Sequence, residues 1–301
     1  MELDWIIVRK KLKKQILFWR TFAVLAVIAL IIFQFGNFDT IKDKNHIAVL
    51  NVSNIITDNP KRSKALIKVA NDDLIKALIV NIDSPGGTVV GGEALYLDLR
   101  EVSSKKPVVA VISDLATSAG YMTAIAADKI FARQSSITGS IGVIIQTTDI
   151  TVLLDKIGIK PEAIKSSPLK AQPSPLEPMS NKTRSATRLV VEDIFNMFID
   201  MVSTRRNMNR QTVKKLADGR IYTGRQAVKN GLIDAIGGEK EALNWLSSDK
   251  NIDKHLPLKL LRFDEEESFL KKILDRFLGK ILISDGLRLD GLVSLWHPMA
   301  R

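Results

Sequence analysis

The chain has 301 residues and a formal net charge of +11, from 44 Lys and Arg against 33 Asp and Glu. Beyond the N-terminus these charges are dispersed and no basic motif is interleaved with aromatic residues, so nucleic acid is not a predicted partner. The absence of cysteine excludes disulfides without fixing a compartment, and no metal-ligand cluster or nucleotide fingerprint is visible, so we predict no metal and no other cofactor.

The N-terminus joins a basic segment to an apolar stretch. Cationic side chains gather between positions 9 and 20, and the residues from 21 to 35 are almost all apolar. This order predicts a basic cytoplasmic N-terminus over residues 1–20 and a transmembrane anchor over residues 21–38. A cleavable signal peptide is the alternative, but no Ala-x-Ala-like cleavage site follows. We therefore expect an uncleaved single-pass anchor in the inner (cytoplasmic) membrane, in contact with lipid, and a periplasmic location for the domain that follows it.

Apolar runs and helical patterns alternate along residues 39–263, which we interpret as one domain. The apolar runs lie at residues 47–52, 74–82, 108–112, 129–132 and 141–145. A helical pattern over residues 60–70 follows a candidate cap at Asn59. Such alternation indicates right-handed βαβ crossovers and a parallel sheet, so the predicted fold class is α/β. A longer helical pattern over residues 180–207 carries an apolar stripe, which we interpret as a packing face.

A glycine-containing turn, Ser84-Pro85-Gly86-Gly87, follows the second apolar run. Two glycines at a strand end let the backbone approach a ligand closely and point N–H groups at it, as an oxyanion hole requires. An ordinary turn between a strand and a helix has the same composition, so both interpretations stay open at this point.

Ser118 lies where the apolar run from Pro107 to Ser113 turns into an Ala-rich stretch. The small residues Ala116 and Gly120 flank it at two positions on either side, an arrangement similar to a nucleophile elbow. In such an elbow, small neighbours allow a strained turn that exposes the serine hydroxyl. The alternative is a serine that only caps the helix.

The base that would activate Ser118 is constrained by composition. The chain has three histidines, and none belongs to a recognisable motif, although a Ser-His-Asp triad stays open because triads are defined by geometry. A lysine base must be neutral, and separation from carboxylates favours that form. No acidic residue lies between Glu162 and Glu177, so Lys170 can serve, but it can equally be a solvated charge. Spacing alone does not choose between Lys170 and Lys165.

Four short motifs occur in order along the chain. They are Asn81-Ile-Asp-Ser-Pro-Gly-Gly87, Ala116-Thr-Ser-Ala-Gly-Tyr121, Ile137-Thr-Gly-Ser-Ile-Gly-Val143 and Ala217-Asp-Gly-Arg-Ile-Tyr-Thr-Gly-Arg-Gln-Ala227. Together they resemble the signal peptide peptidase A family of membrane-bound Ser-Lys proteases, in its short single-unit form. Each motif is weak alone, and the order and spacing of all four make the resemblance specific.

The resemblance implies a role for five residues. Ser118 matches the nucleophile, Lys170 the general base, and Ser140 the second serine, whose hydroxyl orients the lysine amine. For Ser140, the alternative is a loop serine whose hydroxyl only forms a hydrogen bond with a backbone group. The backbone N–H groups of Gly86 and Ala119 match the oxyanion hole, although the family commonly has glycine where this chain has Ala119.

The same resemblance implies a crotonase/ClpP-like spiral fold of βαβ units and a serine endopeptidase. Its expected substrates are cleaved signal peptides and other short membrane-associated peptides. It also implies a homo-oligomer in which neighbouring subunits share each site, completing the dyad between them.

The C-terminal residues 264–301 are predicted to form an amphipathic extension. Residues 265–280 have the pattern of a basic amphipathic helix that lies on the membrane or packs on the domain. Two other functions remain open. One is an inactive membrane scaffold of the same fold, and the other is an acyl-CoA-binding crotonase-type enzyme, which the anchor and the Ser-Lys pair argue against.

Overall fold

The computed structural model describes residues 2–35, 44–263 and 293–295. The predicted C-terminal extension over residues 264–301 therefore lies outside the described residues, apart from one short strand.

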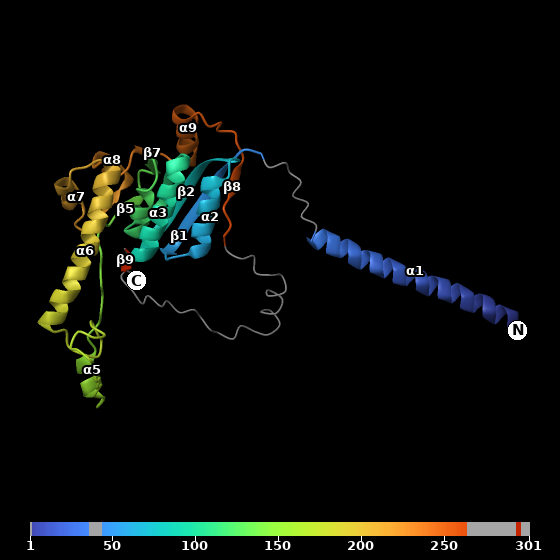
Figure 1. The fold of residues 1–301 in the computed structure, drawn as a ribbon, viewed down its shortest axis with the longest axis horizontal. Coiled ribbons are helices and arrows are strands. Elements are labelled where there is room, and N and C mark those ends of the chain that lie inside the picture. Colours follow the sequence, from blue (N-terminus) through green and yellow to red (C-terminus); the bar gives the residue numbers. More distant parts are fainter. Residues whose placement is uncertain (1, 36–43, 264–292, 296–301) are drawn as a thin grey trace. The chain divides into compact units, whose positions relative to one another are not determined.

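The first of two compact units, Met1–Lys44, contains helix α1 (Glu2–Phe35; Figure 1). Its described side chains, residues 11–30, are all exposed, and they include four cations. Among the described residues, no helix is both long enough and apolar enough to cross a bilayer. The transmembrane anchor predicted over residues 21–38 is therefore not supported, and its last three residues lie outside the described part of the chain.

The second unit, Asn45–Arg301, is built around a nine-stranded sheet. The main path runs β6-β5-β3-β2-β1-β8, while β4 joins β3 to β7 and β9 pairs with β2. All pairs are parallel except β5 with β6 and β2 with β9. The strands are β1 (His46–Ile56), β2 (Ile75–Thr88), β3 (Val108–Thr117), β4 (Lys129–Ala132), β5 (Ile137–Gly139), β6 (Ile221–Thr223), β7 (Ala235–Ile236), β8 (Leu258–Leu260) and β9 (Val293–Leu295).

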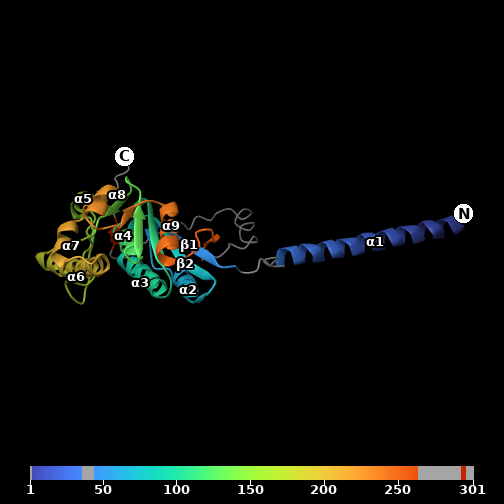
Figure 2. The same cartoon turned by 90° about the horizontal axis from the view of Figure 1, so that it is seen from above.

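Helices cover both faces of this sheet. Successive side chains of the central strands point to opposite faces, so each face contributes its own set of residues to the core. On one face, Leu78 and Val80 of β2 belong to the core formed with α2 (Pro60–Asn71) and α3 (Val89–Lys105). On the other, Ala77 and Ile79 pack with buried residues of α9 (Glu239–Lys250). Figure 2 shows α2 and α3 on one side of the strands and α9 on the other.

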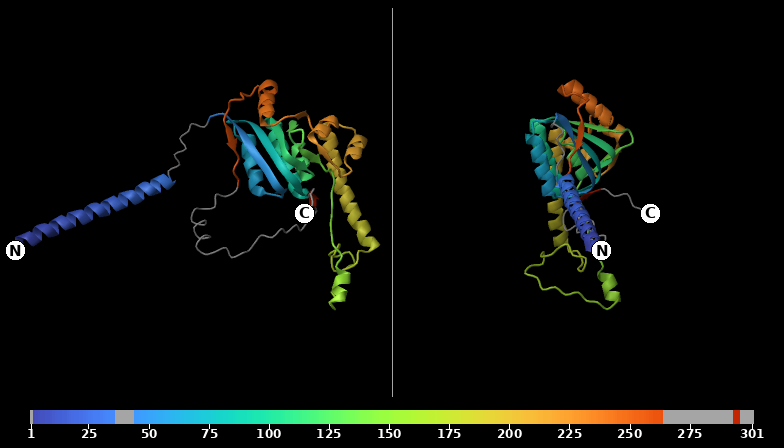
Figure 3. Two further views of the ribbon diagram at one scale, coloured as in Figure 1. Left: turned by 180° about the vertical axis from the view of Figure 1, so that it is seen from behind. Right: turned by 90° about the vertical axis from the view of Figure 1, so that its right-hand side faces the viewer.

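The remaining helices are α4 (Ala119–Ala124), α5 (Thr151–Lys156), α6 (Asn181–Arg206), α7 (Arg210–Leu216) and α8 (Gly224–Lys229). Figures 1 and 3 show the chain leaving the sheet after β5, passing through α5 and returning along α6. We call residues 142–190, which make up this projection, the arm. The apolar stripe predicted on α6 is only partly used for packing, because Phe198 is fully buried whereas Leu189 in the arm is 64% exposed.

The predicted mixed α/β fold with a mostly parallel sheet is confirmed, and α2 starts where expected. The Asn59 side chain accepts hydrogen bonds from the backbone N–H groups of Lys61 and Arg62. The strand predicted at residues 141–145 is wrong, because β5 ends at Gly139. Ser140 has a positive φ of 47° and donates its N–H to the Arg220 carbonyl at 2.8 Å, which ends the extended backbone.

Candidate active site

Ser118 occupies a strained turn between β3 and α4. Its φ is 55° and its ψ is −118°, a combination that costs a non-glycine residue about 1–3 kcal/mol. Although it stands at the N-cap position, its side chain makes no capping hydrogen bond. The capping role therefore does not account for this serine, whereas a strained strand-to-helix turn is the geometry that a nucleophile elbow requires.

Backbone contacts hold this elbow in place. The Ser118 N–H donates to the Gly139 carbonyl at 2.9 Å, and the Ser118 carbonyl accepts from the Met122 N–H at 2.9 Å. A Cβ added to Gly120 would lie 2.8 Å from the Ser84 carbonyl oxygen, so only glycine allows this close approach. Residues 84–87, expected as a turn after the strand, form the irregular last part of β2, and we call them the glycine turn. The elbow therefore packs directly on the glycine turn.

That turn contains Gly86, the first predicted oxyanion donor, with a positive φ of 118°. Its N–H donates to the Ser84 hydroxyl oxygen at 3.1 Å, and the Ser84 hydroxyl donates to the Asn54 carbonyl at 2.5 Å. The Thr117 hydroxyl ties the turn to the elbow by donating to the Pro85 carbonyl at 3.0 Å. Ser84 was missed by the sequence analysis, although its place beside the two glycines marks it.

Ser140 lies beside Ser118 because β5 pairs in parallel with β3. Thr117 and Gly139 are partners in that register, so each serine follows one residue of the same pair. Both serines have positive φ values and are buried, with 1% exposure for Ser118 and 8% for Ser140. The structure thus brings Ser118, Ala119, Gly86 and Ser140 to the carboxyl edge of the sheet.

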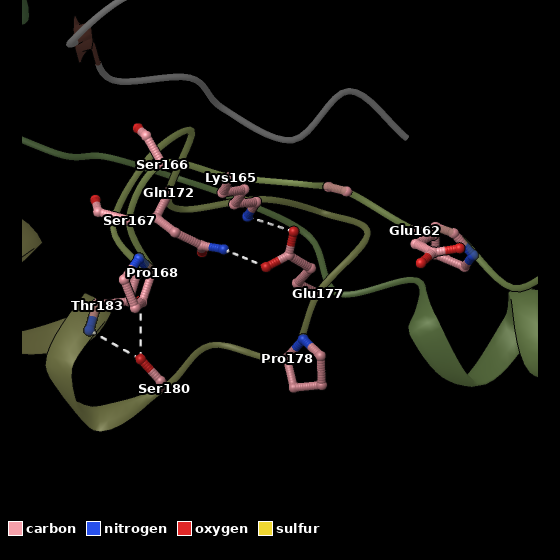
Figure 4. A pocket seen from close by; sticks show the side chains of 12 residues that line it. Glu162, Lys165, Ser166, Ser167, Pro168, Gln172, Glu177, Pro178, Ser180 and Thr183 are labelled. Atoms are coloured by element: carbon pink, nitrogen blue, oxygen red, sulfur yellow. Dashed lines mark hydrogen bonds and ion pairs between the residues drawn. The ribbon is translucent and has the colours of Figure 1, made fainter.

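Lys170 lies elsewhere in this chain. It is exposed in a turn of the arm, where its N–H donates to the Ser167 carbonyl at 3.1 Å. Figures 1 and 3 show the segment between α5 and α6 beyond the end of α6, away from the sheet. The alternative lysine, Lys165, is ion-paired with Glu177 (Figure 4). Of the two candidate bases, Lys170 is therefore the one whose amine is presented to solvent.

The described histidines lie at the opposite edge of the sheet from Ser118. His46 is the first residue of β1, and His255 comes just before β8, which pairs in parallel with the start of β1. His297 lies outside the described residues. Within the described residues, no histidine therefore supports the alternative Ser-His-Asp triad.

Two tyrosines near the site are structural hydrogen-bond donors. Burial raises the pKa of Tyr121 well above its ordinary value, and its hydroxyl donates to the Leu232 carbonyl at 2.8 Å. Burial also raises the pKa of Tyr222, whose hydroxyl donates to the Leu216 carbonyl at 2.9 Å. Both phenols stay protonated at neutral pH, so neither acts as the base.

Strand β9 lies along the edge of β2 beside the predicted oxyanion donor. Its residues Val293–Leu295 pair antiparallel with Gly86–Thr88, in the register Gly86 to Leu295. An extended backbone therefore fits beside this turn.

In the part of the chain that the structure describes, no group of three or more His, Asp or Glu side chains could hold a metal ion.

A buried serine on an elbow, beside a glycine turn at the carboxyl edge of a mostly parallel sheet, is typical of a serine hydrolase. Comparison of the sequence with family profiles identifies the family, because the profile of peptidase family S49 matches residues 100–253. The chain belongs to this family and is a serine peptidase, which confirms the resemblance to the signal peptide peptidase A family.

Individual relatives agree with this assignment. A putative protease of Synechocystis sp. is 35% identical over 70% of this chain and 76% of its own length. A putative signal peptide peptidase SppA of Enterococcus faecium is 35% identical over 62% of this chain and 55% of its own length. The chloroplastic serine protease SPPA of Arabidopsis thaliana is 32% identical over 73% of this chain but only 32% of its own length.

Among solved structures, a mutant of ClpP1 from Listeria monocytogenes aligns with 64% of this chain and 92% of its own, at 15% identity and a TM-score of 0.43.

Proposed function

We propose that this chain is a serine endopeptidase in which Ser118 is the nucleophile and Lys170 the general base. Its proposed substrates are cleaved signal peptides and other short membrane-associated peptides. The observation that carries the proposal is the Ser118 elbow, strained and held against the Gly86 turn with Ser140 beside it. Strain of this kind persists only where the surrounding structure enforces it, and it concentrates at functional sites.

The reaction follows from the residue types. Neutral Lys170 removes the Ser118 proton, the serine oxygen attacks the peptide carbonyl carbon, and the lysine returns the proton to the leaving amine. Backbone N–H groups of Gly86 and Ala119 stabilise the oxyanion. Lys170 then deprotonates a water molecule, which hydrolyses the acyl-enzyme and regenerates Ser118. Because the Gly86 N–H donates to Ser84 in this structure, the oxyanion must take the place of the Ser84 oxygen as acceptor.

A peptide substrate is favoured by the edge of β2. The pairing of β9 with Gly86–Thr88 demonstrates that this edge accepts an extended antiparallel backbone. A peptide bound in this way runs past the Gly86 N–H, with main-chain hydrogen bonds providing affinity regardless of side chain.

We propose further that the dyad is completed between subunits of a homo-oligomer. Lys170 lies on the arm, and the arm exposes many large apolar side chains, an exposure typical of protein interfaces. They are Ile144, Val152, Leu153, Ile157, Ile159, Ile164, Leu169, Leu176, Leu189 and Val190. Packing the arm of one subunit on its neighbour would bury them and bring Lys170 to the neighbour's Ser118.

The membrane location and the finer fold belong to the same proposal. Exposed apolar side chains of α1 next to a basic segment support attachment to a membrane. The proposed location of the catalytic unit is the periplasmic face of that membrane. Resistance of the full chain to carbonate extraction from cell membranes tests the attachment.

The branching of the sheet at β3, which pairs with β4 along Val109–Ile112 and with β5 along Leu115–Thr117, supports the crotonase/ClpP-like spiral.

The decisive experiment measures cleavage of a fluorogenic apolar peptide by the full chain. Ser118→Ala and Lys170→Ala should each abolish turnover, while the matched exposed variants Ser135→Ala and Lys160→Ala should not. Mixing the two inactive variants should restore part of the activity if the dyad is shared between subunits. Turnover that survives in Lys170→Ala would contradict the dyad. Absence of both turnover and fluorophosphonate labelling in the native chain would favour the inactive scaffold.

A further inference from the structure

The segment that carries Lys170 is held by one carboxylate, that of Glu177 (Figure 4). One oxygen of this carboxylate is ion-paired with the Lys165 amine, and the other accepts a hydrogen bond from the Gln172 amide at 2.7 Å. Lys165 comes before Lys170 in the chain and Gln172 comes after it. Glu177 therefore ties together the two sides of the turn that presents Lys170.

Burial gives the ion pair its importance. The Lys165 side chain is 15% exposed and its amine nitrogen is buried, whereas the Glu177 side chain is 38% exposed. Removing the carboxylate would leave a buried cation without compensation, which is strongly destabilising. Removing the lysine instead would leave a carboxylate that water can reach. Removing the Glu177 carboxylate should therefore disturb the segment more than removing the Lys165 amine.

Glu177 comes shortly before the start of α6 in the chain. Ser180 is the N-cap of α6, and its hydroxyl oxygen accepts from the Thr183 N–H at 3.1 Å. Thr183 is 3% exposed, so the start of α6 is firmly packed. Glu177 comes three positions before Ser180, so only a short stretch of backbone separates its carboxylate from this packed helix start.

We propose that Glu177 is a positioning residue for the general base. It fixes the turn on which Lys170 stands, and it occupies the amine of Lys165, so that Lys170 and not Lys165 reaches the nucleophile. The proposal rests on the proposed function, since it assigns Glu177 a role in that reaction. A misplacement of about 1 Å at a reacting group can lower turnover by about 100-fold, so such a tie matters for rate.

The test compares variants of the full chain in the fluorogenic peptide assay. Glu177→Gln should lower kcat about tenfold or more with KM within about twofold, because the base moves while the peptide site at β2 is unchanged. Adding Lys165→Met should recover most of the lost kcat, since no buried cation then lacks a partner. Glu162→Gln, an exposed carboxylate on the same segment, is the matched control and should leave kcat unchanged.

Gln172→Leu removes the second contact without changing any charge, and it covers the case in which Glu177→Gln does not fold. It should also lower kcat at constant KM. Native kcat in Glu177→Gln and Gln172→Leu, together with an inactive Lys170→Ala, would overturn the positioning role alone. The positioning role would also be overturned if Glu177→Gln and Gln172→Leu lowered kcat and thermal stability together and Lys165→Met relieved neither loss. Full turnover in Lys170→Ala would instead contradict the proposed function, so the two failures are distinguishable.

Discussion

The two halves of the proposed dyad lie in contrasting parts of the molecule. The Ser118 elbow is buried at the carboxyl edge of the sheet and is held by backbone hydrogen bonds and a close glycine contact. Lys170 lies on an exposed arm whose apolar side chains are largely unpacked in the single chain. The nucleophile is therefore prepared by the fold of one chain, whereas the position of the base depends on side-chain ties and on what covers the arm.

The largest effect should come from the nucleophile itself. Ser118→Ala should abolish turnover and fluorophosphonate labelling while keeping the positive φ of the elbow and its strain. Ser118→Gly should be equally inactive but more stable than Ser118→Ala by about 1 kcal/mol, because glycine adopts this backbone without strain. Thermal unfolding of the two variants measures the difference. Equal unfolding temperatures would mean that the elbow holds no strain.

The next largest effect should follow from crowding the elbow. In Gly120→Ala the added Cβ would meet the Ser84 carbonyl at 2.8 Å, so the elbow must move away from the turn at Gly86. We expect a loss of about 1–3 kcal/mol in stability and most of the labelling by a fluorophosphonate probe. Gly142→Ala is the control, since its added Cβ would have nothing closer than 3.9 Å. Normal labelling in Gly120→Ala would show that the contact is not needed.

The arm can be tested by placing a charge on its apolar surface. Val152→Asp should lower turnover by about tenfold or more and reduce the oligomer size, because an unpaired carboxylate buried in an interface costs several kcal/mol. Ile67→Asp on α2 is a matched control, since Ile67 is also an exposed apolar residue, at 46%. Sedimentation velocity and peptide turnover measure both effects. An unchanged oligomer with unchanged turnover would argue against assembly through the arm.

The smallest effect concerns Asp98, a carboxylate on α3 whose hydrogen-bond partner Ser63 lies on α2. Burial raises the pKa of Asp98, although the hydrogen bond from the Ser63 hydroxyl, at 2.6 Å, opposes this. A raised pKa in the folded state favours folding at low pH, and this contribution is lost as the pH rises through the folded-state pKa. The native chain should therefore lose this contribution between pH 3 and pH 7, and Asp98→Asn should not. Measured against the native chain, Asp98→Asn should be more stable at pH 7 than at pH 3, by about 0.5 kcal/mol or less.

Thermal unfolding at the two pH values measures this effect, with the exposed Asp73→Asn as control. Turnover should stay unchanged. A stability gain at pH 3 instead would reverse the sign of the proposed pKa shift.

Much of the fold could be predicted because its signals are local. The apolar runs that became β1, β2 and β3 are long and β-branched, and Asn59 caps α2 by contacts within three residues. The strand predicted at residues 141–145 failed because the positive φ of Ser140 depends on a partner, the Arg220 carbonyl, far along the chain. An apolar run carries no information about such a partner.

The candidate site divides in the same way. Motif resemblance predicted Ser118, Gly86, Ala119 and Ser140, and the structure placed them at one edge of the sheet. The motif resemblance could not predict that the Ser84 hydroxyl oxygen accepts a hydrogen bond from the Gly86 N–H, because that contact depends on the backbone angles of the glycine turn.

By itself, the sequence determined the α/β class, the central strands, the elbow at Ser118 and the family, since each rests on residues that are close along the chain. Only the tertiary structure decided that Ser140 stands beside Ser118, that Lys165 is paired with Glu177, and that the segment between α5 and α6, which contains Lys170, projects away from the sheet. These facts depend on strand register and on the packing of distant segments, where contact free energies of the whole fold outweigh any local preference.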